Sequence, residues 1–507
     1  MEQCKNKVTA AVFGAAAVIN IILLLFAAPF TEYTWKREFD LPNILLLPIA
    51  LLFMGVLYLT VCRLREKLLR CWGKGGVFTA FLFLCEVYWC YNTYFRTGWD
   101  AGFSVWPAAV EMSYGVPVTN DWYFSLYPNN ILITWLYSII LRINWRFGIL
   151  DAPTGIFSLV IFNCLISAIT AYLVFRIVEK MVNSYAALYA WILYSVFMGI
   201  APWLLIPYSD SVILFFPVAI VYLYLCGNKN VVLKWFAIGF LTYTAFRIKP
   251  QGLIPFIAIF IVEFLEACHS KHIRQFIRPA AGLAVSLLAG TLAYRLILAD
   301  TGLVLEKGRS YGLAHYVMMG LNEEVDGTWS IDDTSFSYEI DDPEERNAAA
   351  WKVAGERLKN YGFAGLMGHL ARKQLVNFND GMFSWTYEGS DFWTEIYERK
   401  NDYISGILRS MYYDEKNRHV LATYLQAIWI AILFLMGVSI LRKEKSRAVN
   451  VCMLTVVGIC LAQLLLEARA RYIYGFAPIM LILAVVGINN IVVKVFRQPF
   501  PGSQNEP

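Results

Sequence analysis

The sequence predicts an all-α polytopic membrane protein, and its composition and apolar patterning are the observations that predict this. Of the 507 residues, 58% are hydrophobic and 16% are charged, and the mean hydropathy is +0.52. A soluble chain of this length needs a far more polar surface. The apolar residues also fall into runs near the ~20 residues with which a helix crosses a bilayer. We therefore expect a bundle of about 12–13 transmembrane helices.

The apolar runs follow one another along most of the chain. We interpret the N-terminal run as a membrane helix rather than a signal peptide, because no small-residue cleavage site is obvious and more spans follow. Two segments, 127–143 and 154–178, are additional candidates. The main runs are 8–30, 41–62, 77–95, 184–206, 211–226, 231–246, 251–267, 279–299, 420–441, 449–466 and 472–496.

The distribution of charge and cysteine excludes several classes of function. Residues 300–420 hold 21 Asp and Glu against 13 Lys and Arg, and the other segments together are basic. Their basic residues lie in short loops between spans, which argues against a nucleic-acid partner. The ten cysteines all lie outside 300–420, without metal-ligand spacing or a disulfide framework. We expect neither a metal nor a cofactor.

Three short basic loops orient the predicted spans. They are "RLREKLLRCWGK" (63–74), "HSKHIRQFIR" (269–278) and "RKEKSR" (442–447). Because short cytoplasmic loops are enriched in Lys and Arg, we expect these loops and both termini to be cytoplasmic in a multi-pass cell-membrane protein. The first outer loop (96–126), the acidic segment 300–420, and the "RIKP" and "EARARYIY" turns then lie outside.

One conflict arises between residues 126 and 175. "FRIVEKMVN" (175–183) also resembles a cytoplasmic loop, so the number of crossings before it must be odd, yet two candidate spans lie there. Either 127–143 is re-entrant or lies flat, or one of the two segments is not a crossing. We expect 12 full crossings and one partial segment, which is tolerable where it lines a protein-covered cavity.

Four regions follow from this pattern. We expect two extra N-terminal helices in 1–76, a transmembrane core in 77–299, an extracytoplasmic cap in 300–420, and the last helices with a short cytoplasmic tail in 421–507. The cap is predicted to be mostly helical. Asp342 caps one helix, Pro343 takes its first position and Gly362 ends it, and "FAGLMGHLARKQLVNFN" predicts a second.

Charged side chains gather in the turns that we place outside. Single charges at span ends commonly anchor a helix or form a structural ion pair. Carboxylates and guanidinium groups meeting on one face instead suggest a site for an anionic ligand beside a base, because Arg binds phosphate through a bidentate fork and Lys acts as a point charge. The candidates are Asp100, Asp121, Asp210, Arg247, Lys249, Glu467, Arg469 and Arg471.

Asp100 is the main candidate for a catalytic base. It follows a span directly, where a fixed carboxylate could accept the proton of an attacking hydroxyl group. Its structural alternative is the N-cap of a short interfacial helix over "DAGFSVWPAAVEMSYG", and the two roles are compatible. Asp121 is either a turn residue or a second functional carboxylate. We interpret Glu111 as an exposed helix residue.

Other polar residues are candidates for substrate contacts. "YPNN" is either a turn whose proline sets the entry to a helix, or a set of partners for sugar hydroxyls. His315 lies among apolar neighbours, where a single histidine is more often structural than functional. No nucleotide-binding glycine loop, HExxH, GxSxG or CxxC motif occurs, which argues against an ATP-driven pump or a cytosolic nucleotide-sugar enzyme. The substrate-contact set is Tyr127, Asn129, Asn130, Asp210, His315 and Glu467.

An ordered series of motifs resembles the GT-C polytopic glycosyltransferases, and most closely the bacterial, mainly Gram-positive, relatives of glycosyltransferase family 39, the protein O-mannosyltransferase-like enzymes. The resemblance covers about residues 77–495. Its motifs are "WDAGFSVWPAAVEM…YFSLYPNN", "PYSD", "RIKP", "HYVMMGLNEEVDG", "NDGMFSWTYEG" and "EARARYIYGFAPI".

The resemblance implies a GT-C-type bundle and transfer of a sugar from a polyprenyl-phosphate donor. The acceptor would be a cell-envelope polymer, a lipid glycan or a protein on the outer face. By the resemblance, Asp100 matches the general base of an inverting displacement, and the lipid phosphate is held by Arg247, Lys249, Arg469 and Arg471. One departure is that many members carry paired acids "DE" in the first loop, whereas Ala101 follows Asp100 here. That leaves open whether Asp121 supplies the second carboxylate.

Two alternatives remain open. A transporter or flippase of lipid-linked sugars should show an internal repeat and polar or broken segments at mid-membrane. A glycan polymerase or ligase that uses polyprenyl-diphosphate-linked glycans is closer in chemistry. The polar groups gather in outward turns under a single large cap, and this asymmetry favours an enzyme embedded among membrane lipids.

Overall fold

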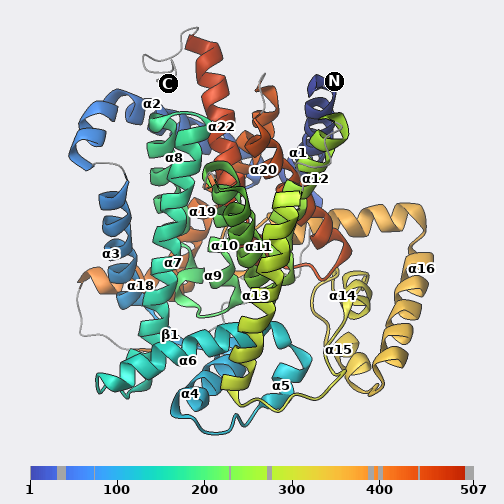
Figure 1. Ribbon diagram of the computed structural model, residues 1–507. Helices are drawn as coiled ribbons and strands as arrows, with labels where there is room; N and C mark the ends of the chain where they lie inside the picture. The colour runs from blue at the N-terminus through green and yellow to red at the C-terminus, as the bar shows by residue number, and fades with distance from the viewer. Residues whose placement is uncertain are drawn as a thin grey trace.

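The protein is almost entirely helical, as predicted. The computed structural model describes residues 2–30, 41–72, 75–227, 230–270, 277–385, 393–397, 403–442 and 446–496. Within these residues the chain forms a bundle of long helices and a group of shorter helices gathered toward one end (Figure 1).

Ten helices in the described residues are long and apolar enough to cross a membrane. This confirms the prediction of an all-α polytopic membrane protein. The helices are α1 (Glu2–Phe30), α2 (Asn43–Trp72), α7 (Ala152–Met181), the pair α9 (Ser209–Ile213) and α10 (Phe215–Cys226), α11 (Val231–Ile248), η5 with α12 (Pro250–Leu253 and Ile254–Ser270), α13 (Ile277–Thr301), α19 (Glu415–Val438), α20 (Arg447–Leu465) and α22 (Ala477–Phe496).

Three further predicted spans form shorter or more polar helices. α3 (Gly76–Thr93) carries a buried Glu86, and α8 (Ser184–Phe197) is short. Both run alongside the long helices in Figure 1. α6 (Ile131–Arg146) has 16 residues, or about 24 Å, and lies across the end of the bundle opposite the termini (Figure 1). This agrees with the alternative in which 127–143 lies flat.

The two helices predicted in the cap form the two parts of α16 (Pro343–Phe378). The same region also contains α14 (Leu313–Gly320) and α15 (Ile331–Tyr338), which were not predicted as helices, and α15 begins within the predicted loop "NEEVDGTWSIDD". The Asp342 carboxylate accepts hydrogen bonds from the N–H groups of the first turn of α16, and Pro343 is its first residue. Gly362 has φ 59°, so α16 bends there into two helices, which a glycine allows without steric penalty.

The chain ends and the cap lie at opposite ends of the bundle (Figure 1). The first turn of α1 and the last turn of α22 lie at the same end. At the other end lie α4 (Trp106–Tyr114) and α5 (Asp121–Leu126), which belong to the first predicted outer loop, and α5 is the one nearer to α15 (Figure 1).

A small sheet joins two distant segments at the site. β1 (Phe95–Thr97) pairs antiparallel with β2 (Trp393–Ile396). Trp203 anchors the same region, because its indole N–H donates to the carbonyl of Phe383 at 2.9 Å. The loop after α16 is therefore fastened both to the first loop and to the interior of the bundle. Two further helices in the described residues are α18 (Tyr403–Tyr413), which precedes α19, and the short α21 (Arg471–Tyr474), which lies between α20 and α22.

Candidate functional site

A tight turn between β1 and the following π-helix holds Asp100 in place. Trp99 has φ 34°, an unfavourable conformation for a residue with a side chain. A Cβ on Gly102 would fall 1.6 Å from the carbonyl oxygen of Thr97, so only glycine fits there. Residues Ala101–Val105 form a π-helix, and both backbone strain and π-helical turns are frequent at functional sites.

Two tyrosines donate hydrogen bonds to Asp100. The hydroxyl of Tyr123 lies 3.0 Å from Oδ2, and that of Tyr208 lies 3.4 Å from the same oxygen. The Asn130 amide donates to both phenol oxygens, at 2.7 and 3.1 Å. Burial, with Tyr208 and Asp100 close by, raises the pKa of Tyr123 well above its ordinary value, so this phenol stays protonated and donates. Asp100 occupies the position before the π-helix, but its side chain makes no capping hydrogen bond there.

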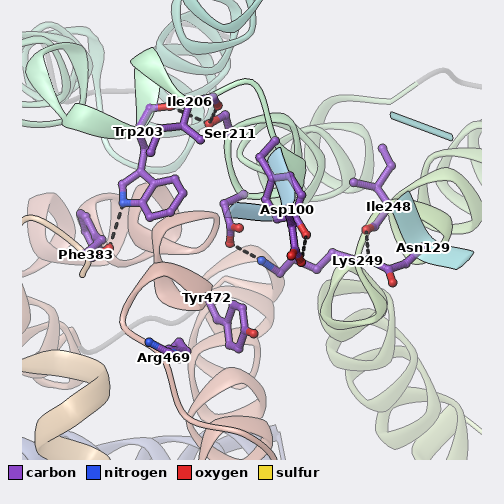
Figure 2. A network of polar contacts seen from close by, with 12 residues as sticks. Asp100, Asn129, Trp203, Ile206, Ser211, Ile248, Lys249, Phe383, Arg469 and Tyr472 are labelled. Carbon is purple, nitrogen blue, oxygen red and sulfur yellow. Dashed lines mark hydrogen bonds and ion pairs between the residues drawn. The ribbon is translucent and has the colours of Figure 1, made fainter. Parts of the chain in front are cut away.

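Lys249 and Asp210 form a buried ion pair beside Asp100. Asp210 comes from the start of α9, and Lys249 is the first residue after α11, where the backbone becomes extended. The ammonium group also lies 4.3 Å from the centre of the Tyr472 ring. Figure 2 shows Lys249 between Asp100 and Tyr472. Burial lowers the pKa of Lys249, and the neighbouring Asp210 opposes this shift.

The segment between α20 and α22 supplies a second cation and a carboxylate. The Arg471 guanidinium lies 4.8 Å from the centre of the Trp99 ring, so the strained residue before Asp100 also orients this arginine. Glu467 is buried and accepts a hydrogen bond from the Tyr472 hydroxyl at 3.1 Å. The Nε of Arg469 lies 3.6 Å from Oε1 of Glu467, on the far side of Tyr472 from Lys249 in Figure 2.

These groups line one cavity of about 930 Å³. Its polar end holds the Asp100 and Lys249 groups. One part of the lining is apolar and comes from α11, η5, α12 and the end of α20, whereas another part comes from the cap and is rich in hydroxyl and aromatic groups. The apolar wall includes Phe246, Leu253, Ile254, Ile257 and Leu466, and the cap wall includes Tyr311, Tyr316, Trp329, Thr334, Tyr338 and Glu339.

Comparison of the sequence with known families identifies a family of integral membrane proteins. A family model described as "conserved hypothetical integral membrane protein" matches residues 16–492. The chain belongs to this family. The match supports an integral membrane protein and names no activity. No curated protein matches the chain.

The structure of this family member brings most of the predicted site residues together. Eight of the twelve candidates line the same cavity, although Asn130 is buried and its amide hydrogens serve the two tyrosines rather than the cavity. The eight are Asp100, Tyr127, Asn129, Asn130, Asp210, Lys249, Glu467 and Arg471.

Four predicted residues do not line that cavity. Asp121 opens α5 and lies outside the lining. Arg247 faces a different hollow. His315 is buried inside the cap, where Nδ1 lies 2.7 Å from the Ser337 hydroxyl and the ring stacks on Tyr311. Arg469 sits beside Glu467 but is not part of the lining.

Sequence reasoning missed the aromatic residues that organise the site. Trp99, Tyr123, Tyr208 and Tyr472 each contact a charged group of the cavity. All four occur inside recognised motifs, "WDAGFSVWPAAVEM…YFSLYPNN", "PYSD" and "EARARYIY". The charged residues of these motifs indicate a site, whereas Tyr and Trp are too common at membrane interfaces to indicate one by themselves.

The arrangement can perform acid–base chemistry next to an anionic group. Asp100 supplies a fixed carboxylate, and the two cations stand on the same cavity. The described residues contain no group of three or more His, Cys, Asp or Glu side chains that could hold a metal ion. The cavity also suits a ligand with an apolar part, because one of its walls is contributed by membrane helices.

Proposed function

We propose that this protein is a membrane glycosyltransferase. It transfers a sugar from a polyprenyl-phosphate donor to an acceptor hydroxyl on the extracytoplasmic face of the cell membrane. The observation that carries the proposal is that Asp100 and Arg471 line one cavity with an apolar wall from membrane helices. A base, a cation and a lipid-compatible wall are the three elements that such a donor requires.

In the proposed reaction, Asp100 acts as general base. The acceptor hydroxyl oxygen attacks the anomeric carbon, and its proton passes to the Asp100 carboxylate. The bond between the anomeric carbon and the phosphate oxygen breaks, and both of its electrons leave with the polyprenyl phosphate. This single displacement inverts the anomeric centre. The hydrogen bonds from Tyr123 and Tyr208 hold the carboxylate in position for the transfer.

Arg471 is the cation best placed to hold the donor phosphate. Its guanidinium is oriented by Trp99 and Tyr472, at 4.8 and 5.4 Å from the ring centres. Arginine binds phosphate oxygens in a bidentate fork and stabilises the charge that develops on the leaving group. Lys249 contributes a weaker field, because Asp210 compensates its charge.

The two walls of the cavity suit the two substrates. The prenyl chain would lie on the apolar wall, where Ile257 is 45% exposed. The acceptor would enter along the cap, where Trp329 and Tyr338 expose aromatic faces and Glu339 and Thr334 offer polar groups. An enzyme that transfers a sugar from a lipid donor to a polar acceptor must admit each substrate separately.

The decisive experiment follows sugar transfer from a panel of radiolabelled polyprenyl-phosphate sugars in membranes. We expect Asp100→Asn to reduce turnover at least 100-fold, with donor binding changed less than about threefold. Asp121→Asn is the matched control, because this carboxylate belongs to the same loop but lies outside the cavity lining. We expect it to retain near wild-type turnover.

Other outcomes would favour the alternatives. Transfer by Asp100→Asn at the wild-type rate removes the proposed base. Movement of intact donor across vesicles without sugar release favours a flippase. Release of polyprenyl diphosphate from glycan-linked carriers, with no reaction of monophosphate donors, favours a polymerase or ligase.

A further inference from the structure

Arg247 faces a second, separate hollow in the membrane part of the bundle. The hollow has a volume of about 410 Å³ and lies between α6, α7, α10, α11 and α13. Its lining is almost wholly aliphatic or aromatic, and Arg247 is its only charged residue. Representative lining residues are Leu136, Phe162, Ile166, Phe215, Phe240 and Ile297.

Neighbouring residues at the end of α11 line two different cavities. Phe246 and Lys249 line the Asp100 cavity, whereas Arg247 and Ile248 line the hollow. The partition between them includes the Ile248 carbonyl, which accepts a hydrogen bond from the Asn129 amide at 3.4 Å. A ligand on Arg247 is therefore not in the cavity that contains Asp100.

The Arg247 guanidinium is directed back along α11, away from the turn that follows it, because it contacts Tyr243 one turn earlier in the helix. It is 4.1 Å from the centre of the Tyr294 ring, and Tyr294 lies seven residues before the end of α13 at Thr301, about 10 Å along the helix axis. Its Nε and one terminal nitrogen donate to the Tyr243 hydroxyl, at 3.2 and 3.0 Å. Within the described residues, Arg247 forms no ion pair with a carboxylate.

A guanidinium group in such apolar surroundings is stabilised by an anion bound next to it. A charged side chain inside a bilayer is costly unless it is paired, and aromatic rings with one phenol compensate a guanidinium only in part. The charge and the lining together match a phosphate attached to a long apolar chain. The walls are also open to lipid, since Ile169 is 37% exposed and Tyr243, Tyr294 and Phe162 are half-buried.

We propose that the Arg247 hollow binds one anionic phospholipid of the surrounding bilayer. The lipid phosphate pairs with Arg247, and an acyl chain lies against Phe240, Phe215 and Phe162. The polyprenyl-phosphate donor is the less suitable occupant, because a phosphate on Arg247 would be separated by the Asn129–Ile248 partition from the carboxylate that must act on it. The proposal does not require the glycosyltransferase activity.

Native mass spectrometry of the purified full chain tests this inference. Dioleoyl phosphatidylglycerol, dioleoyl phosphatidylcholine and undecaprenyl phosphate are added separately to delipidated protein, and the retained lipid is counted. We expect wild type to retain one phosphatidylglycerol at least about tenfold more strongly than phosphatidylcholine. Arg247→Gln should abolish this preference, and Arg247→Lys should keep part of it.

Two further variants make the test specific. Arg295→Gln removes an exposed arginine of α13 that lines neither cavity, so it should bind phosphatidylglycerol as wild type does. Ala293→Trp fills the hollow without changing charge and should weaken retention of phosphatidylglycerol about as much as Arg247→Gln. Gel filtration should show that each variant remains monodisperse.

Three results would overturn the proposal. The first is equal retention of the two phospholipids by wild type. The second is unchanged phosphatidylglycerol retention in both Arg247→Gln and Ala293→Trp. The third is retention of undecaprenyl phosphate alone, lost in Arg247→Gln, which would make the hollow a seat for the donor.

Discussion

At the scale of single residues, the site depends on side chains that compensate one another. Asp100, Lys249 and Glu467 are each held by a tyrosine or by an opposite charge. Removing one partner therefore affects the others, and single substitutions mix structural and functional effects. Paired substitutions separate the two.

The Lys249–Asp210 pair gives the clearest case. Lys249→Met leaves the buried Asp210 carboxylate without its counter-charge and should lower the free energy of unfolding by about 3–5 kcal/mol. Asp210→Asn/Lys249→Met should recover most of that loss in a thermal unfolding assay. If the double variant is no more stable than Lys249→Met, the two residues are not coupled as the structure indicates.

The double variant also tests the role of Lys249 toward the donor. Because Asp210 already compensates the lysine charge, we expect Arg471→Gln to raise the donor KM more than the double variant does. A larger KM change in the double variant would reassign the phosphate to Lys249.

His315 makes the stability of the cap depend on pH. Burial lowers the pKa of His315 from 6.5 to about 4; Asp333 opposes this shift, and Arg346 adds to it. As pH falls below about 6.5, the unfolded chain takes up a proton that the folded cap does not. The stability present at higher pH is therefore lost progressively toward pH 4.

Thermal unfolding between pH 8 and pH 4.5 measures this effect. We expect His315→Gln to flatten part of the decline in stability as the pH falls. At pH 8 the histidine is neutral in both the folded and the unfolded chain, so its titration should make no contribution to stability there. Burial also lowers the pKa of His369, so some dependence should persist. An unaltered pH profile in His315→Gln would contradict the account.

At the scale of elements, α16 fastens the cap to the loop that carries Arg471. The Lys373 ammonium is buried and donates to three carbonyls, of Gly320, Leu464 and Leu466, at 2.7–2.8 Å. These carbonyls end α14 and α20. One side chain therefore sets the distance between the cap and the last turn of the site.

Lys373→Met should loosen both ends that the ammonium holds. We expect amide hydrogen exchange to rise about tenfold or more in 318–322 and 464–468, because three buried carbonyls lose their donor. Lys352→Met on the exposed face of α16 is the control and should leave exchange unchanged. Equal protection in the two variants would refute the role of Lys373.

The sequence predicted the two parts of α16 because their end signals are local. Asp342, Pro343 and Gly362 act through the backbone within a few residues. The β1–β2 pair was not predicted, since its short strands lie almost 300 residues apart and only the folded chain brings them together. The sequence also did not predict that Arg247 and Lys249 line different cavities. Lys249 leaves the helix with φ −155°, so helical spacing gives no direction for its side chain.

At the scale of the whole molecule, the account requires that the site face away from the cytoplasm. The termini and the cap lie at opposite ends of the bundle (Figure 1), and the basic loops predict which end is inside. Cysteine labelling in intact cells tests the assignment, in a background whose native cysteines, including the exposed Cys85 and Cys268, are replaced by alanine.

Two exposed positions at opposite ends serve for the labelling. Asp332→Cys lies on α15 in the cap and should react with a membrane-impermeant maleimide. Arg63→Cys lies at the end of the apolar span Asn43–Leu64 within α2 and should react only after the cells are permeabilised. The reverse pattern would place the cavity in the cytoplasm and remove the proposed donor supply.

The most direct test of the central claim is a cryo-EM map of the protein with a bound polyprenyl-phosphate sugar. We predict phosphate density on Arg471, the prenyl chain along Ile254 and Ile257, and the anomeric carbon facing Asp100. Donor density that lies wholly outside this cavity, with no sugar near the Asp100 carboxylate, would contradict the account.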